Sequence, residues 1–411
     1  LGVVRVANGF TAKSEGNIVS GTGSDAYLDA GTQVTLQAEK GNVGSADQAL
    51  RVLNKNNVPI DVTAQNAWLK GVANTSGADT NTMSLRNVRV NTLLHAESEG
   101  TLKTNAVSAG KAELAAADDV EIGGLLAVDT EFTAKAKGRI YETESGVVRT
   151  QSGTDKVELE AGRGIALDNR DNSFVRMVVH GTENANASGG YNAIDGNVSI
   201  TVNGDRDWSL MAPEIKDEAI PVKGILATIG SPVNGNVSLV NVAKDATVVL
   251  YKNGIVTNKG EAGEGDVSIA ADKTIVVTQE ISAAHDVSVK SNAGHIYVKH
   301  AIEAKEGSIR VTTGEGNIHV GDSGPNRKTI TAKKDITLAT DLGKIDIHGK
   351  TESLEGDITL SAKSKEYNPG ADGMNILLSD QGVVKAAGYV NLKTENGDIH
   401  ITDRIISGEG L

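Results

Sequence analysis

Apolar and polar residues alternate in a short phrase that returns along residues 285–360. The phrase runs from a small or polar residue through any residue to Val or Ile, then a polar residue, then Val, Ile or Leu. Its copies are HDVSV, GHIYV, GSIRV, GNIHV, KDITL, GKIDI and GDITL, starting at positions 285, 294, 307, 316, 334, 343 and 356. Alternation with a period of two predicts short strands with one buried face. The Gly and Asn residues between the copies predict turns.

The spacing of these copies is regular. Successive starts differ by 9, 13, 9, 18, 9 and 13 residues, so a short and a long step together make a period of 22. The single step of 18 is a step of 13 with five residues added around positions 322–325. Such a period indicates a solenoid and leaves no room for helices. Hairpins would not alternate short and long links so regularly. We therefore predict an all-β, right-handed parallel β-helix with about 20–22 residues per coil and loop excursions.

Stacked coils place equivalent residues in columns. The first strand of successive coils should contribute two interior columns, which are Val287, Ile309, Ile336 and Ile358, and Val289, Val311, Leu338 and Leu360. Neighbouring strands lie about 4.8 Å apart, so β-branched side chains can fill a narrow interior. This interior explains why only 3 Phe and 2 Trp accompany 39% apolar residues.

The remaining sequence follows the same pattern with interruptions. We expect one β-helix over residues 1–411, with looser coils over 1–167, an excursion-rich segment over 168–234 and regular coils over 235–411. The pattern is weak between 46 and 90, which we interpret as coils with longer loops. GNVSI at 196 and GNVSL at 235 are 39 residues apart, close to two coils, yet three prolines lie between them. Because Pro does not suit interior strands, an excursion is expected around 205–234. Another insertion is expected around 367–370.

Charge and composition exclude several classes of protein. The formal charge of −13 is spread over interspersed acidic and basic residues, whereas a nucleic-acid-binding protein would carry a basic stripe. No apolar run approaches 18 residues, so no membrane insertion is expected. The absence of Cys excludes disulfides and is compatible with secretion. No initiator Met or export signal is present, and both ends suggest a piece of a longer protein.

The repeats resemble those of a known family. The runs AGKAEL at 109–114, AADDVEI at 116–122 and GDITL at 356–360 resemble repeats of filamentous haemagglutinin-like large exoproteins, the secreted partners of two-partner secretion systems. The resemblance covers most of the chain and is strongest over 100–167 and 235–401. It implies a rod-like surface protein that an outer-membrane transporter exports and that functions in adhesion. The family's amino-terminal secretion domain, with its Asn-Pro-Asn-Leu motif, is absent, so no residue here is assigned to transporter recognition.

One pair of outward residues suggests chemistry. The second strands place Tyr297, His319 and Asp346 in one outward column, so His319 and Asp346 are expected to be neighbours. A His–Asp pair can act as a base and its orienting group. A solvated polar ladder explains the same pattern, and it is the interpretation we adopt. Asp118 and Asp119 are interpreted as turn residues, although a glycosidase would need two carboxylates at a defined separation. No catalytic residue is therefore assigned.

Metal and cofactor motifs are missing. The eight His residues are scattered, and neither a His-x-Glu motif nor a Gly-Gly-x-Gly-x-Asp calcium repeat occurs. The acidic, Gly-rich run at 260–266 is interpreted as a turn rather than a cation site. We expect no metal and no cofactor.

If the protein binds a partner, the excursion loops are the expected place, because inserted loops carry the individuality of a repetitive scaffold. The candidate binding residues are Tyr191, Arg206, Asp207 and Trp208. An exposed Trp among charged residues can stack on a sugar ring or anchor a protein. The alternative is that Trp208 only packs the excursion onto the coil.

Two functions of different class remain. The first is a non-enzymatic rod or stalk segment of a secreted bacterial surface adhesin, a monomer that meets a glycan or protein receptor on host cells or other bacteria. The second is a β-helical polysaccharide lyase or hydrolase, which requires a cleft beside three or more ionisable groups on adjacent coils. A phage-type fibre, which would trimerise, is a more distant third.

Overall fold

Every regular element in the described part of the chain is a β-strand. The computed structural model describes residues 2–21, 26–55, 58–74, 81–152, 155–184, 190–215, 220–260, 264–321, 329–364, 374–379 and 382–408. These residues contain no helix that could span a membrane. The chain divides into two compact units, residues 1–194 and 195–411.

The first unit contains the strands β1 (Val4–Val6), β2 (Phe10–Ser14), β3 (Leu28–Ala30), β4 (Val34–Ala38), β5 (Leu50–Leu53), β6 (Pro59–Val72), β7 (Thr82–Ser98), β8 (Thr101–Ala116), β9 (Val120–Ile122), β10 (Leu125–Ala136), β11 (Arg139–Glu142), β12 (Val147–Thr150), β13 (Lys156–Ala161), β14 (Gly164–Leu167) and β15 (Arg176–His180).

The second unit contains the strands β16 (Val198–Val202), β17 (Gly224–Ile229), β18 (Val233–Asn234), β19 (Val237–Asn241), β20 (Thr247–Leu250), β21 (Ile255–Asn258), β22 (Val267–Ala271), β23 (Ile275–Val277), β24 (Ile281–Ala283), β25 (Val287–Ser291), β26 (Ile296–Val298), β27 (Ile302–Ala304), β28 (Ile309–Thr313), β29 (Ile318–Val320), β30 (Thr329–Ala332), β31 (Ile336–Thr340), β32 (Ile345–Ile347), β33 (Lys350–Ser353), β34 (Ile358–Lys363), β35 (Met374–Leu378), β36 (Val383–Ala386), β37 (Val390–Glu395), β38 (Asp398–Ile401) and β39 (Arg404–Ser407).

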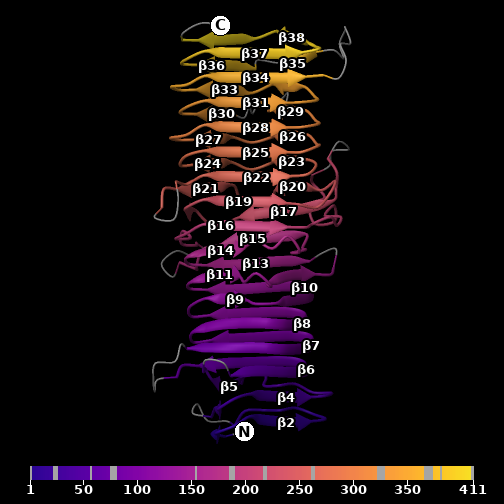
Figure 1. Ribbon diagram of the computed structural model, residues 1–411, viewed down its shortest axis with the longest axis vertical. Helices are drawn as coiled ribbons and strands as arrows, with labels where there is room; N and C mark the ends of the chain where they lie inside the picture. The colour runs from indigo at the N-terminus through magenta and orange to yellow at the C-terminus, as the bar shows by residue number, and fades with distance from the viewer. Residues whose placement is uncertain are drawn as a thin grey trace. The chain divides into compact units, whose positions relative to one another are not determined.

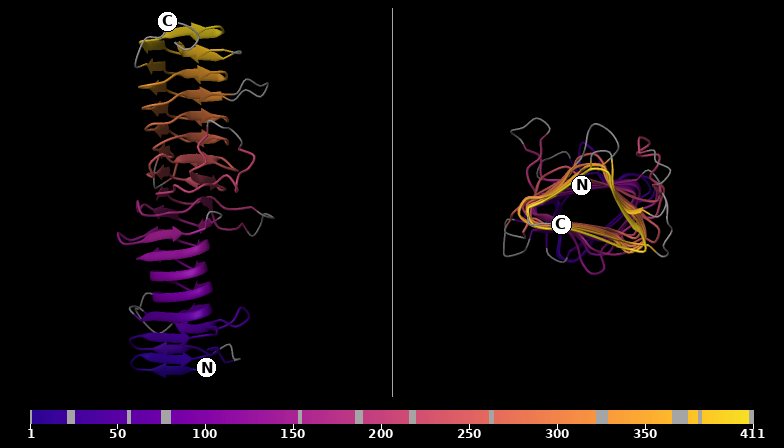
Figure 2. Two further views of the ribbon diagram at one scale, coloured as in Figure 1. Left: turned by 90° about the vertical axis from the view of Figure 1, so that its right-hand side faces the viewer. Right: turned by 90° about the horizontal axis from the view of Figure 1, so that it is seen from above.

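In the second unit each coil contributes three strands, such as β25, β26 and β27. Each strand pairs in parallel with its equivalent in the next coil, as β25 does with β28, β26 with β29 and β27 with β30. The third strands form a separate parallel sheet from β18 to β39. The strands of this unit stack in sequence order in Figure 1, and from above its coils trace a triangle (Figure 2). The predicted all-β parallel β-helix is confirmed. The pairings do not depend on the hand of the coil, so right-handedness stays a prediction.

The predicted interior columns are confirmed. Val287 pairs with Ile309, which pairs with Ile336 in the next coil. The column continues from Ile336 to Ile358, and all four side chains are at most 1% exposed. The second column, Val289, Val311, Leu338 and Leu360, has the same register and is fully buried. A phrase of alternating residues is therefore enough to place side chains on the inside of each coil.

Hydroxyl groups also line the interior, at the end of the first strand. Ser291, Thr313 and Thr340 follow one another in register and are at most 3% exposed. The Thr313 hydroxyl donates to the carbonyl oxygen of Gly294 at 2.6 Å, and that of Thr340 to Gly316 at 2.7 Å. Each buried hydroxyl thus satisfies a carbonyl at the turn, which removes the cost of burying either group alone.

The first unit differs from the prediction between residues 46 and 90. Instead of short strands and longer loops, β6, β7 and β8 run for 14, 17 and 16 residues. These strands remain paired while they turn the corner of the coil, because register shifts such as those at Ile60/Asp61 and Val90/Leu93 absorb the bend. The expectation of loops was wrong because a bulge can replace a Gly-rich turn.

The interruption of the second unit is a single coil with an excursion. Val198 and Val237 are direct neighbours in register, so the 39 residues between the two GNVS phrases make one coil and not two. The excursion is confirmed, but it ends earlier than expected, because β17 returns to the sheet at Gly224 and pairs with β20. The expected insertions at 322–325 and 367–370, and residues 261–263 of the acidic turn, lie outside the described residues.

Candidate functional site

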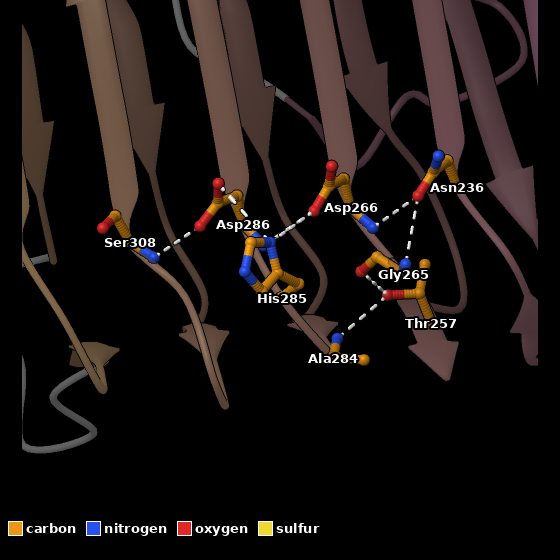
Figure 3. Close-up of polar contacts among 8 residues, drawn as sticks. All are labelled: Asn236, Thr257, Gly265, Asp266, Ala284, His285, Asp286 and Ser308. Atoms are coloured by element: carbon orange, nitrogen blue, oxygen red, sulfur yellow. Dashed lines mark hydrogen bonds and ion pairs between the residues drawn. The ribbon is translucent and has the colours of Figure 1, made fainter. Parts of the chain in front are cut away.

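Side chains at the turn before the first strand of each coil form a ladder with the backbone of the next coil. Asn236 accepts a hydrogen bond from the Asp266 N–H at 2.8 Å, and Asp266 accepts one from the Asp286 N–H at 3.0 Å. Asp286 in turn accepts from the Ser308 N–H at 2.7 Å, as Figure 3 shows. Asp335 and Asp357 continue the pattern further along the chain. The Asn or Asp of each repeat therefore links two coils.

His285 joins this ladder and creates the one group of ligand-type side chains found in the described residues. Its Nδ1 lies 3.0 Å from Asp266 Oδ1 and 3.5 Å from Asp286 Oδ2. Together these three residues have the composition of a divalent-metal site. However, Nδ1 must carry a proton to donate to Asp266, and one oxygen of each carboxylate already accepts a backbone N–H. The group is explained by the ladder without an ion (Figure 3).

A second group lies on the outward face of the second strands. Tyr297 on β26, His319 on β29 and Asp346 on β32 are successive partners in register, so the predicted column is confirmed. The rings of Tyr297 and His319 are stacked with centroids 5.0 Å apart, and Lys299 lies over the Tyr297 ring. His319 Nδ1 forms an ion pair with Asp346 Oδ2 at 3.8 Å.

Asp346 also contacts a histidine on its own strand side. His348 Nε2 lies 3.0 Å from Asp346 Oδ2, and its Nδ1 lies 3.2 Å from the Ser379 hydroxyl. Burial opposes ionisation of Asp346, but hydrogen bonding and charge from His319 and His348 outweigh it and hold the pKa of this carboxyl below its ordinary value. The carboxylate therefore orients two imidazoles at once.

A third imidazole begins the same face. His295 Nδ1 accepts the backbone N–H of Asn317 at 3.0 Å, so its remaining proton lies on Nε2. Burial lowers the pKa of His295, and the nearby His319 adds to that effect. A neutral imidazole beside a carboxylate-held one is the arrangement that general acid–base chemistry uses. A cavity of about 340 Å³ lies near His295, and it is lined by Glu315, Asn317, Leu342, Gly343, Lys344, Ser364 and Asn375. Neither His319 nor Asp346 lines it.

The excursion places its candidate residues differently from the expectation of an exposed ring. Trp208 is 1% exposed, so its ring cannot stack on a ligand, and the expectation of an exposed Trp was wrong. The segment forms an antiparallel bridge between Asp207 and Lys223, in which the Trp208 N–H donates to the Val222 carbonyl oxygen at 2.9 Å. The bridge turns the indole inward, where it packs in the interior of the second unit.

The polar members of the candidate set serve local structure. Asp207 accepts the Ser209 N–H at 2.7 Å, and this hydrogen bond lowers the pKa of its carboxyl. The Arg206 carbonyl oxygen accepts the Gly224 N–H at 3.0 Å, where the chain re-enters the coil. Tyr191 belongs to the first unit, is 37% exposed and stacks on His180 with centroids 4.2 Å apart. A binding role for Tyr191, Arg206 and Asp207 stays a prediction.

Two residues of the histidine group were missed from the sequence. His348 follows Asp346 by two positions, so the period of a strand could have placed both on one face. Ser379 comes from β35, whose register is hidden in the sequence by the residues inserted after β34. No spacing argument could have joined it to His348.

The comparisons with known proteins leave the argument to the structure. No family model, no curated protein and no solved structure matches this chain. Function must therefore be argued from the coils and their outward side chains.

Proposed function

We propose that the chain is a non-enzymatic rod or stalk segment of a secreted bacterial surface adhesin that mediates attachment to host cells or other bacteria. The observation that supports this most is how outward charges are used. Lys111 lies 2.9 Å from Glu113 and 3.0 Å from Glu131 of the next coil. Lys135 pairs with Glu160 at 2.8 Å in the same way.

Such ladders consume charge between coils instead of gathering it around a substrate. Exposed ion pairs of this kind each contribute little to stability, roughly 0–1 kcal/mol. They do keep the outer face soluble and its charges matched along the stack. A spacer that carries attachment loops needs this property, and the resemblance to exoprotein repeats points the same way.

The second candidate is a polysaccharide lyase or hydrolase, and the histidine group favours it. His319 and His348 share Asp346, and His295 is held neutral on the same face. A base oriented by a carboxylate is what proton abstraction from a uronic acid would require.

One experiment separates the two proposals. Fluorescently labelled protein is incubated with epithelial cells and with bacteria, and in parallel with acidic glycans whose unsaturated products absorb in the ultraviolet. The adhesin proposal predicts saturable binding to at least one cell type and no product above the buffer level. Product formation that His319→Ala abolishes would overturn it in favour of the enzyme. Absence of binding to both cell types would also contradict it.

A further inference from the structure

A groove of about 510 Å³ lies on the outward face of the first unit, over β4, β6, β7, β8 and β10. We call it the polar groove, and it is lined by Gln33, Thr35, Gln37, Asp61, Thr63, Asn87, Val88, Arg89, Ala106, Val107, Ser108, Leu125 and Ala127. Its hollow follows from the register. Arg89 pairs with Ser108 and Ser108 with Ala127, so a long side chain is followed by two short ones in the next coils.

One side of the polar groove is closed upon itself. Asp61 accepts hydrogen bonds from Arg86 Nε at 2.9 Å, from the Asn87 amide at 3.1 Å and from Gln33 at 3.0 Å. The Arg86 guanidinium holds the pKa of the Asp61 carboxyl below its ordinary value. This carboxylate is therefore neutralised and would not repel an anion.

The other side is a column of polar side chains without internal partners. Gln37, Thr63, Arg89 and Ser108 follow one another in register across four coils. None of these side chains makes a hydrogen bond or ion pair with another residue that the structure describes. Elsewhere in this unit, outward columns pair across coils, as Lys111 does with Glu131. Donors left open along a groove are suited to an external acceptor.

We propose that the polar groove binds an acidic oligosaccharide, with Arg89 holding a carboxylate and the amide and hydroxyl side chains holding sugar hydroxyls. The guanidinium presents a fork of donors that matches a carboxylate. Leu125, 44% exposed at the edge of the groove, offers an apolar contact for a sugar ring. This inference rests on the proposed function and names the class of receptor that the adhesin would hold.

A peptide fits this surface less well. Peptides that add to sheets need a strand edge with free N–H and C=O groups. Here β6, β7 and β8 are paired in parallel on both sides, so the floor of the groove offers no such edge. Recognition must come from side chains, which suits a ligand rich in hydroxyl and carboxyl groups.

The test uses the whole chain and a trimer of α-1,4-linked galacturonate as probe, with its methyl ester and hexaglutamate for comparison. Binding is measured by isothermal titration calorimetry. We expect the trimer to bind, and Arg89→Gln or Ser108→Tyr to weaken it at least tenfold. Arg139→Gln should change it less than twofold, because Arg139 stacks on Tyr141 outside the groove. Both groove positions are exposed, so a melting curve confirms that each variant is folded.

Each outcome decides the proposal. Loss of binding with the methyl ester and with Arg89→Gln supports it. Absence of trimer binding at millimolar concentration, equal binding by Arg89→Gln, or equal binding of hexaglutamate would overturn it. Cell attachment that survives Arg89→Gln would remove the groove from the account while leaving the adhesin proposal standing. Trimer binding without cell attachment would do the reverse.

Discussion

At the scale of single residues, a carboxylate fixes which amino acid can stand before the strand of the next coil. Asp357 Oδ1 accepts the Tyr389 N–H at 2.8 Å, and a Cβ atom on Gly388 would lie only 2.2 Å from that oxygen. The next nearest atoms would be 3.2 and 3.4 Å away, so the oxygen is the obstacle. This contact explains why Gly and Asp or Asn recur together in the repeat.

A double-mutant cycle tests this contact. Gly388→Ala should destabilise the second unit by about 1–3 kcal/mol, because the Ala methyl group displaces the carboxylate from its hydrogen bond. Asp357→Ala should also destabilise it, through the lost hydrogen bond. The double variant should be clearly more stable than the sum of the two predicts, because the obstacle is then gone. Urea denaturation measures all four proteins, and strict additivity would show that the two residues do not interact.

Glu142 is the residue whose ionisation works against folding in the first unit. Its Oε2 accepts hydrogen bonds from the Asn169 N–H and the Asn172 side chain, both at 3.1 Å. Its Oε1 is buried and has no hydrogen-bond partner among the described residues. Burial raises the pKa of this carboxyl to about 7, against the opposing effect of the two hydrogen bonds.

This pKa predicts a pH dependence of stability. A carboxyl with a higher pKa in the folded than in the unfolded state binds its proton more tightly when folded. Stability contributed by Glu142 is therefore present at pH 4 and is lost as the pH rises to about 7. Glu142→Gln should be about 1–3 kcal/mol more stable than the natural protein at pH 8 and about equal to it at pH 4. Denaturation at both pH values measures this, and a difference that does not vary with pH would contradict it.

At the scale of elements, sequence was sufficient wherever turns are marked and the alternation is strict. The strands from β22 to β34 were predictable because Gly, Asn or Asp separates each alternating run. The long strands β6 to β8 were not, because their corners are made by register shifts within continuous pairing. Neither Gly nor Pro marks such a bulge reliably.

The candidate sites divide in the same way. His319 and Asp346 could be placed together because equal coils preserve the register between them. The burial of Trp208 could not be foreseen, because an antiparallel bridge in the excursion decides which way its ring points. The polar groove depends on which outward columns pair internally, and that depends on side-chain conformations which spacing alone does not determine.

At the scale of each whole unit, stability is a sum over neighbouring coils, since each coil contacts only those beside it. The interior columns of the second unit keep their register although consecutive coils differ in length. Arg310 pairs with Thr337, 27 residues on, whereas Ser288 pairs with Arg310 only 22 residues on. Added residues must therefore leave the coil as loops, because a slip of one residue would turn the apolar face outward.

Spin labelling tests this register directly, because the chain has no cysteine of its own. Nitroxide labels are attached to cysteines introduced at Arg310 and Thr337, which are neighbours in one sheet, and at Arg310 and Thr331, which lie in different sheets. Neighbouring strands are about 4.8 Å apart, so the 310/337 pair should show strong dipolar broadening at room temperature. The 310/331 pair, although closer in sequence, should show little. Broadening that is absent from 310/337, or equal in both pairs, would contradict the stacked parallel coils on which the whole account depends.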